Sequence, residues 1–331
     1  MVNKDQKLSE KIFKKEIEKK FIRDGFGEGL VIAGERDPGV VVLTADLKES
    51  TRVNLFAEKF PERFIEVGVA EQAMATVASG LANYGKIPFI SSYAVFSPGR
   101  NWEQIRTTIA IDGYPVKIVA GQSGLNIGHY GVTHQGLEDI SLMRVLPNMT
   151  IIVPADYEEA KKATIEIAET PGPVYLRLPR VDSPSFTSEE TPFKIGKAEI
   201  LWESKSPEVA IVACGLLVYE ALKAAKTLDK NGIETLVINS HTIKPLDEQT
   251  IIRAARTCGA VVTVEEHQVS GALGGAVAEV LSKNFPVPIE MVGIQDRFGQ
   301  SGRVKELNEE YGLTKEDVEK AVKKVLARKN S

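Results

Sequence analysis

VVVLTAD, residues 40–46, runs from β-branched residues to a polar end, which predicts a buried strand whose last side chains reach the edge of a sheet. Similar runs follow in the first half of the chain: FIEV (64–67), PFISS (88–92), VKIVAG (116–121), TIIVPAD (150–156) and VYLRL (174–178). Between them, residues 72–81 and 157–167 carry apolar side chains at helical spacing. This alternation predicts an α/β fold, with helices on both faces of a mostly parallel sheet.

A second series of strands and helices begins after residue 193. Residues 181–193, VDSPSFTSEETPF, concentrate Pro, Ser, Thr and Glu without periodicity, as an interdomain linker does. Beyond them the predicted strands VAIVACG, ETLVINS and AVVTVEE alternate with helices over 216–228, over 248–257 and after Gly275. We therefore expect two α/β domains, residues 1–183 and 195–331, joined by a linker over 184–194.

The composition is that of an ordinary globular protein, with 43% hydrophobic and 26% charged residues. A net charge of −4 gives no electrostatic footprint for nucleic acid, and the Lys-rich residues 11–20 alternate with apolar ones, which predicts a solvated amphipathic helix. No apolar stretch reaches the roughly 18–20 residues that cross a bilayer, so we expect a cytoplasmic protein with no membrane partner. Cys214 and Cys258 belong to no Cys-x-x-Cys pair and are expected to be buried thiols, not metal ligands.

Polar clusters follow the predicted strands of the first domain. Because ligands of open α/β sheets bind at the carboxyl ends of the strands, these clusters are the first candidates for a site. They are TADLKES (44–50), GVAEQ (68–72), SSYAVFSPGRNW (91–102), GQSGLNIGHYGVTHQG (121–136) and RLPR (177–180).

Two longer segments give these clusters a family likeness. GVAEQAMATVASGLA (68–82) and GVTHQGLEDISLMRVLPNMTIIVPAD (131–156), with the upstream spacing of Arg23, Asp46 and Ser50, together resemble the pyrimidine-binding domain of transketolases. The rest of the chain resembles the transketolase C-terminal domain. The resemblance spans almost the whole chain and implies the C-terminal subunit of a split transketolase. Such an enzyme of the pentose phosphate pathway transfers a two-carbon ketol unit between ketose and aldose phosphates with thiamine diphosphate.

The resemblance assigns catalytic roles to Glu71 and His134. The family glutamate at the position of Glu71 hydrogen-bonds N1′ of the cofactor's aminopyrimidine, a task that suits a carboxyl group whose pKa is raised by burial. His134 matches a histidine that faces the substrate, where imidazole can donate or accept a proton near neutral pH. Taken alone, Glu71 could equally be a first-turn acid favoured by the helix dipole, and His134 a structural histidine.

Further cofactor and substrate contacts are implied by the same likeness. The aminopyrimidine would pack on an aromatic segment and lie near an acidic residue, which assigns cofactor binding to Phe96, Tyr93, Trp102 and Asp46. Sugar-phosphate binding is assigned to Arg23, Ser50, Gln122, Tyr130, His134 and Arg180, since guanidinium groups suit phosphate. His129 and Tyr130 stand where typical transketolases have an acidic pair, and Gln122 replaces a substrate histidine, so the preference for the ketol donor or the stereochemical selection of the substrate is expected to differ.

The diphosphate half of the cofactor site has no counterpart in the chain. Thiamine-diphosphate enzymes hold Mg²⁺ and the diphosphate with a Gly-Asp-Gly motif, and none occurs here. GFGEG (25–29) and GALGG (271–275) are better interpreted as turns or helix starts. We therefore expect an N-terminal transketolase subunit to bind Mg²⁺ and the diphosphate, in an α2β2 heterotetramer.

Other thiamine enzymes remain as alternatives. Deoxyxylulose-phosphate synthase and the β subunit of 2-oxo-acid dehydrogenases share much of the pattern, and a non-catalytic paralogue would keep the fold without the chemistry. Glu265, Glu266 and His267 follow a predicted strand of the second domain, but the sequence gives no reason to prefer a site there. We expect that domain to serve packing and assembly.

Overall fold

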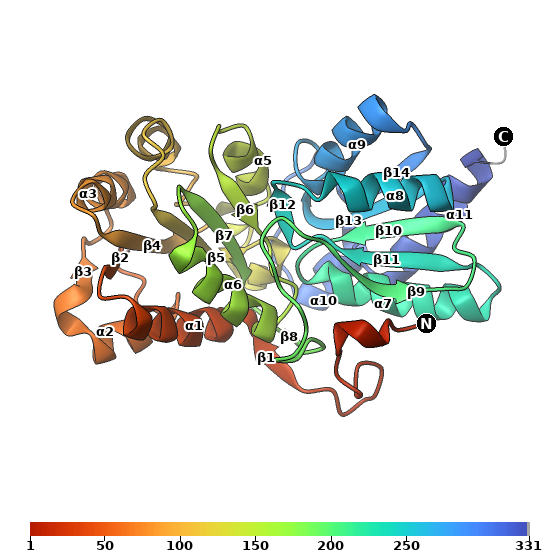
Figure 1. Cartoon of the computed structure of the whole chain (residues 1–331), viewed down its shortest axis with the longest axis horizontal. Coiled ribbons are helices and arrows are strands. Elements are labelled where there is room, and N and C mark those ends of the chain that lie inside the picture. The colour runs from red at the N-terminus through yellow and green to blue at the C-terminus, as the bar shows by residue number, and fades with distance from the viewer. Residues whose placement is uncertain (330–331) are drawn as a thin grey trace.

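The computed structural model describes residues 1–329 and contains two α/β domains that lie side by side (Figure 1). Each domain is built on a mostly parallel sheet that carries helices on both faces. The predicted fold class is thereby confirmed. None of the helices in these residues combines the length and the apolar character that crossing a bilayer requires.

The first sheet has seven strands in the order β12-β6-β7-β5-β4-β2-β3. Six of them come from the first half of the chain and pair in parallel: β2 (Val40–Thr44), β3 (Phe64–Glu66), β4 (Ile87–Tyr93), β5 (Lys117–Ser123), β6 (Thr150–Ile152) and β7 (Val174–Pro179). These are the six predicted strands. The seventh, β12 (Thr242–Lys244), comes from the second half of the chain and runs antiparallel to β6.

Helices cover both faces of this sheet (Figure 1). One face carries α1 (Ile22–Arg36), α2 (Asn54–Lys59) and α6 (Tyr157–Glu169). The other carries α3 (Glu71–Asn83), α5 (Asp139–Arg144) and the short α4 (Trp102–Gln104), which continues as a π-helical segment, η3 (Ile105–Ala110). Short 3₁₀ turns lie at η1 (Lys4–Gln6), η2 (Pro61–Arg63), η4 (Leu125–Tyr130) and η5 (Val132–His134).

The second sheet has five strands in the order β14-β13-β10-β11-β9. They are β9 (Glu199–Glu203), β10 (Val209–Ala213), β11 (Thr235–Asn239), β13 (Val261–Gln268) and β14 (Ile289–Ile294). β9 runs antiparallel to its neighbour β11. One face carries α7 (Leu217–Lys230), α10 (Val304–Glu310) and α11 (Lys315–Lys329), and the other α8 (Glu248–Cys258) and α9 (Leu273–Asn284). The predicted helices of this half are confirmed, and Cys214 and Cys258 are buried free thiols.

One apolar cluster runs through both domains. It joins Met74 and Ala78 of α3 to Ile251 of α8 and to Leu273 and Val277 of α9. Because this core is continuous, the two sheets pack as one body and the second domain can hold loops of the first.

The GFGEG segment lies inside α1, not in a turn. A Cβ atom at Gly25 would lie 2.1 Å from the Tyr157 carbonyl oxygen, and one at Gly29 would lie 2.7 Å from the Lys161 carbonyl oxygen. The two glycines therefore allow α1 to approach α6 more closely than any side chain would permit. Close packing here outweighs the low helix propensity of glycine.

The predicted amphipathic helix over residues 11–20 is wrong. This segment forms turns that lead into the short strand β1 (Lys19–Phe21). Ile12 is buried, its carbonyl accepts a hydrogen bond from the Tyr219 hydroxyl, and Phe13 packs edge-on against Trp202. Ile12 and Phe13 thus pack against the second domain instead of forming one face of a solvated helix.

The predicted linker is fastened to the first domain. β8 (Asp182–Pro184), whose last residue begins the linker, pairs antiparallel with β1. The Asp156 carboxylate then accepts hydrogen bonds from the Phe186 and Thr187 amides at 2.8 and 2.6 Å. Because β12 and the N-terminal segment each reach across to the other domain, the boundaries at 183/184 and 194/195 stay a prediction.

Candidate functional site

Four aromatic side chains gather at the carboxyl end of the first sheet. Tyr93 ends β4, and its ring stacks with that of Phe96 at 5.9 Å between centroids. The His134 ring meets Tyr93 and Phe96 edge-on, at 6.3 and 5.7 Å, and lies 5.3 Å from the Tyr130 ring. The structure therefore brings these four predicted residues together, and we call them the ring cluster.

Glu71 lies at one end of the ring cluster. It begins α3, its side chain is 1% exposed, and its Oε2 lies 2.7 Å from Nη1 of Arg100. The Arg100 guanidinium in turn lies over the Phe96 ring, 4.8 Å from its centroid. Asn101 donates a hydrogen bond to the Glu71 carbonyl at 3.0 Å. Sequence reasoning missed Arg100 and Asn101, although both lie in the polar cluster that follows β4.

The predicted phosphate-binding residues lie at the other end. The Ser50 carbonyl accepts hydrogen bonds from Arg23 Nη1 at 3.0 Å and from Gln122 Nε2 at 3.2 Å. Gln122 is buried, has a positive φ of 55°, and its Oε1 has no hydrogen-bond partner within residues 1–329. The Arg180 guanidinium lies over the Tyr130 ring, 4.5 Å from its centroid. The unpaired, buried Oε1 of Gln122 is able to accept a hydrogen bond from a ligand hydroxyl.

Positive charge accumulates at this end. Burial lowers the pKa of Arg23, and the charges of Arg52 and Arg180 lower it further, against the opposing effect of Asp24. A groove of about 340 Å³ opens beside Arg180, Tyr130 and His129. Like charges held together in this way suit a bound anion.

Two predicted cofactor residues lie apart from these contacts. The indole N–H of Trp102 donates to the Leu142 carbonyl at 2.7 Å, and its ring packs against the apolar core. Asp46 is exposed in a left-handed conformation, with its amide donating to Glu66. Neither residue makes a described contact with the ring cluster.

A buried ion pair supports the loop that carries Gln122, Tyr130 and His134. Asp139 Oδ2 lies 2.8 Å from Arg177 Nε and accepts a hydrogen bond from the Tyr175 hydroxyl at 2.6 Å. Burial opposes ionisation of Asp139, but the charge of Arg177 prevails and holds the pKa of the carboxyl below its ordinary value. Arg177 Nη2 also donates to the Gly136 carbonyl at the end of the loop.

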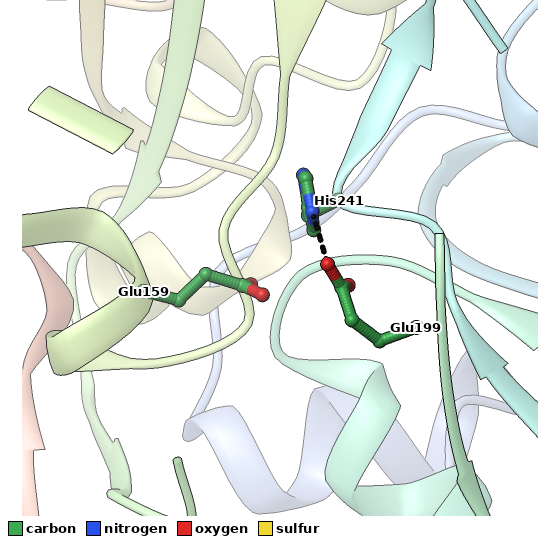
Figure 2. Close-up of side chains that lie close together, drawn as sticks. All are labelled: Glu159, Glu199 and His241. Atoms are coloured by element: carbon green, nitrogen blue, oxygen red, sulfur yellow. Dashed lines mark hydrogen bonds and ion pairs between the residues drawn. The ribbon is translucent and has the colours of Figure 1, made fainter. Parts of the chain in front are cut away.

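One group of side chains within residues 1–329 has the ligand types of a metal site, away from the ring cluster. Glu159, Glu199 and His241 are buried between the domains, with one ligand atom from each within 4.8 Å of the others (Figure 2). His241 Nε2 lies 3.0 Å from Glu199 Oε1, while Glu159 accepts hydrogen bonds from the Ala155 amide and from Asn239. Burial raises the pKa of Glu159 to about 7 and that of Glu199 to about 9 and lowers that of His241, which favours one proton held in the 3.0 Å contact between Glu199 Oε1 and His241 Nε2.

Family models match both halves of the chain. The model described as transketolase, pyrimidine binding domain, matches residues 18–184, and the one described as transketolase, C-terminal domain, matches residues 196–318. Together they cover most of the chain.

Similar proteins agree with these matches. A putative transketolase C-terminal section of Methanocaldococcus jannaschii is 45% identical, over 92% of this chain and 95% of its own. A 6-deoxy-6-sulfo-D-fructose transketolase subunit of a Clostridium species is 41% identical, over 96% and 98%. A solved structure described as a split gene transketolase, inactive β4 tetramer, has 45% identity and a TM-score of 0.86, with 93% of this chain and 98% of that chain covered.

Proposed function

Because this chain belongs to the transketolase family, we propose that it is the C-terminal subunit of a split transketolase. It transfers a two-carbon ketol unit from a ketose phosphate to an aldose phosphate, together with an N-terminal subunit. The names of two relatives support a separate partner chain, since one is a C-terminal section and another a split-gene product. Pairs of each subunit would form an α2β2 heterotetramer.

The observation that carries this proposal is a continuous row of side chains across the sheet edge. It starts at the buried Glu71 carboxylate, passes through Arg100 and the ring cluster, and ends at the Arg180 and Arg23 guanidinium groups. A carboxylate, flat rings and paired cations in this order match a heteroaromatic cofactor at one end and a sugar phosphate at the other.

The aminopyrimidine end of thiamine diphosphate fits these residues. Glu71 is buried and Phe96 only partly so, and the carboxylate and the aromatic face that a ring would use are contacted in the structure by the half-exposed Arg100. When bound, the cofactor supplies the carbanion chemistry, and this chain orients it and moves protons. We assign its binding to Glu71, Phe96 and Tyr93, and retain Asp46 and Trp102 only as sequence-based candidates. The partner would bind the diphosphate and Mg²⁺, because this chain has no Gly-Asp-Gly motif.

Substrate contacts fall to the other end of the row. Arg23 and Arg180 would hold the phosphate with the help of Ser50, while His134 would hydrogen-bond the reacting hydroxyl or carbonyl group. Gln122 and Tyr130 would bind further sugar hydroxyls. The Clostridium relative is named for a sulfonated sugar, so the anion on the substrate of this chain need not be phosphate.

Reconstitution tests the proposal. Ketol transfer from xylulose 5-phosphate to ribose 5-phosphate is measured with thiamine diphosphate and Mg²⁺, using this chain alone, a cognate N-terminal subunit alone, and both. We expect turnover only in the mixture. Turnover of pyruvate in place of the ketose phosphate would assign the chain to another thiamine enzyme, and turnover by this chain alone would remove the need for a partner.

A further inference from the structure

The loop that carries the proposed substrate residues is fastened by the second domain. Residues 121–136 hold Gln122, Tyr130 and His134, and the Gly124 amide donates to the Gly136 carbonyl to close the loop at 3.0 Å. Gln135 Nε2 donates to the Gln300 carbonyl at 3.0 Å. Ser301 donates from its hydroxyl to the His129 carbonyl at 2.9 Å. The second domain therefore does more than pack and assemble.

Glu266 makes the contact nearest the start of this loop. It lies in β13, at the carboxyl end of the second sheet, and is 5% exposed. Its Oε1 accepts a hydrogen bond from the backbone N–H of Asn126 at 2.9 Å. Gly124, with a φ of +77°, passes so close that a Cβ atom there would lie 2.2 Å from the same Oε1. Only a glycine at position 124 therefore leaves room for the Glu266 carboxylate.

Arg177 links this contact to the far end of the loop. Its Nη2 donates to the Glu266 carbonyl at 3.1 Å and to the Gly136 carbonyl at 3.0 Å. Gly136, at the far end of the loop, is therefore linked to the strand of Glu266 through Arg177 of the first domain. Burial raises the pKa of Glu266, against the opposing charge of Arg177.

The neighbouring Glu265 provides an internal comparison. It is also fully buried, but it accepts hydrogen bonds from the Leu273 and Gly274 amides at 2.9 and 2.7 Å. It therefore holds the start of α9 instead of the loop. Two adjacent buried carboxylates of the same strand serve different segments.

We infer that Glu266 is a positioning residue, through which the second domain holds the substrate loop 121–136 in its binding conformation. This inference rests on the proposed function, because it assumes that Gln122, Tyr130 and His134 contact the sugar. The effect should fall on sugar binding and not on the cofactor, since Glu71 and Phe96 lie outside this loop.

The test compares Glu266→Ala, Glu266→Gln and Glu265→Ala in the complex with the partner subunit. We expect Glu266→Ala to raise amide hydrogen exchange in peptides covering 121–136, and to raise the KM for the ketose phosphate about tenfold, through loss of one charge-assisted hydrogen bond. The affinity for thiamine diphosphate should not change. Glu266→Gln retains an oxygen that can accept the hydrogen bond from Asn126. Its loop exchange and its KM for the ketose phosphate should therefore be close to those of the wild type. Glu265→Ala should raise exchange at the start of α9 and leave the loop and the KM unchanged.

Other results would overturn the inference. It fails if Glu266→Ala leaves loop exchange and KM unchanged, or if Glu265→Ala changes both to the same extent. Should Glu266→Ala not fold, Gly124→Ala disturbs the same contact from the loop side and is expected to give the same rise in KM. If the wild-type complex transfers no ketol unit, the proposed function fails, whereas loop exchange in the full chain still decides whether Glu266 holds the loop.

Discussion

Arg100 Nη1 lies 2.7 Å from Oε2 of Glu71, and the same guanidinium lies over the Phe96 ring. These are the carboxylate and the aromatic face that the proposed function assigns to the aminopyrimidine. Arg100 is 47% exposed at its side chain, so it can move without loss of buried packing. In the structure, Arg100 thus occupies the contacts that the cofactor is proposed to use.

Arg100→Gln is therefore expected to tighten cofactor binding. An ion pair with a partly exposed arginine contributes up to about 1 kcal/mol, so the Kd for thiamine diphosphate in the reconstituted complex should fall by a few-fold. Isothermal titration of wild-type and variant complexes measures this change. A weaker affinity in the variant would mean that Arg100 orients Glu71 for the cofactor instead of competing with it.

Glu71→Gln tests the catalytic role. The amide keeps the shape of the side chain but cannot exchange a proton, so kcat should fall by about 100-fold or more while the complex still assembles. The measurements are steady-state turnover and size-exclusion chromatography with the partner. Glu58→Gln, at a residue of α2 outside the ring cluster, is the control and should behave as wild type. Equal turnover in both variants would remove Glu71 from the mechanism.

Arg180→Gln tests the anion end. Loss of the guanidinium should raise the KM for a ketose phosphate by about tenfold or more, because a charge-assisted contact to the phosphate is lost. The KM for an unphosphorylated ketose should hardly change. An equal rise in KM for both sugars would place Arg180 against the sugar hydroxyls or in a purely structural role.

Glu199→Gln tests the shared proton between the domains. Burial raises the pKa of Glu199 from 4.5 to about 9, so the folded chain retains a proton that the unfolded chain releases. The contribution of Glu199 to the free energy of unfolding of the wild type therefore decreases as the pH rises from about 4.5 to 9. The amide side chain of the variant does not titrate, so the variant lacks this decrease. At about 1.4 kcal/mol per pH unit, the Tm of the variant relative to wild type should rise by about 5–8 °C between pH 5 and pH 8.5. Glu203→Gln, an exposed position on the same strand, is the control; a pH-independent difference for Glu199→Gln would exclude the proton-sharing account.

The first domain could be predicted well from sequence because its signals are local. Runs such as VKIVAG mark buried strands, and the polar residues after them meet at the sheet edge by topology alone. Tyr93, Phe96, Tyr130 and His134, which the family resemblance assigns to the site, do form one cluster at that edge, whereas Trp102 and Asp46 lie apart from it.

The errors and omissions involve contacts between distant segments. Residues 11–20 follow the surface of the second domain instead of forming a helix, and Gly25 and Gly29 serve close packing against α6. Glu266 meets Asn126 across 140 residues, which no local pattern encodes. The strand-end pattern does place Glu266 at the end of a predicted strand, but its partner in the first domain becomes evident only from the fold.

The central claim is that this chain supplies only the pyrimidine half of a shared cofactor site. Equilibrium binding of thiamine diphosphate with Mg²⁺ tests it most directly, measured on this chain, on the N-terminal subunit and on their mixture. The account predicts tight binding in the mixture and binding weaker by at least about a hundredfold, a difference of about 2.7 kcal/mol or more, for this chain alone. Equal affinity of the single chain and the mixture would contradict it.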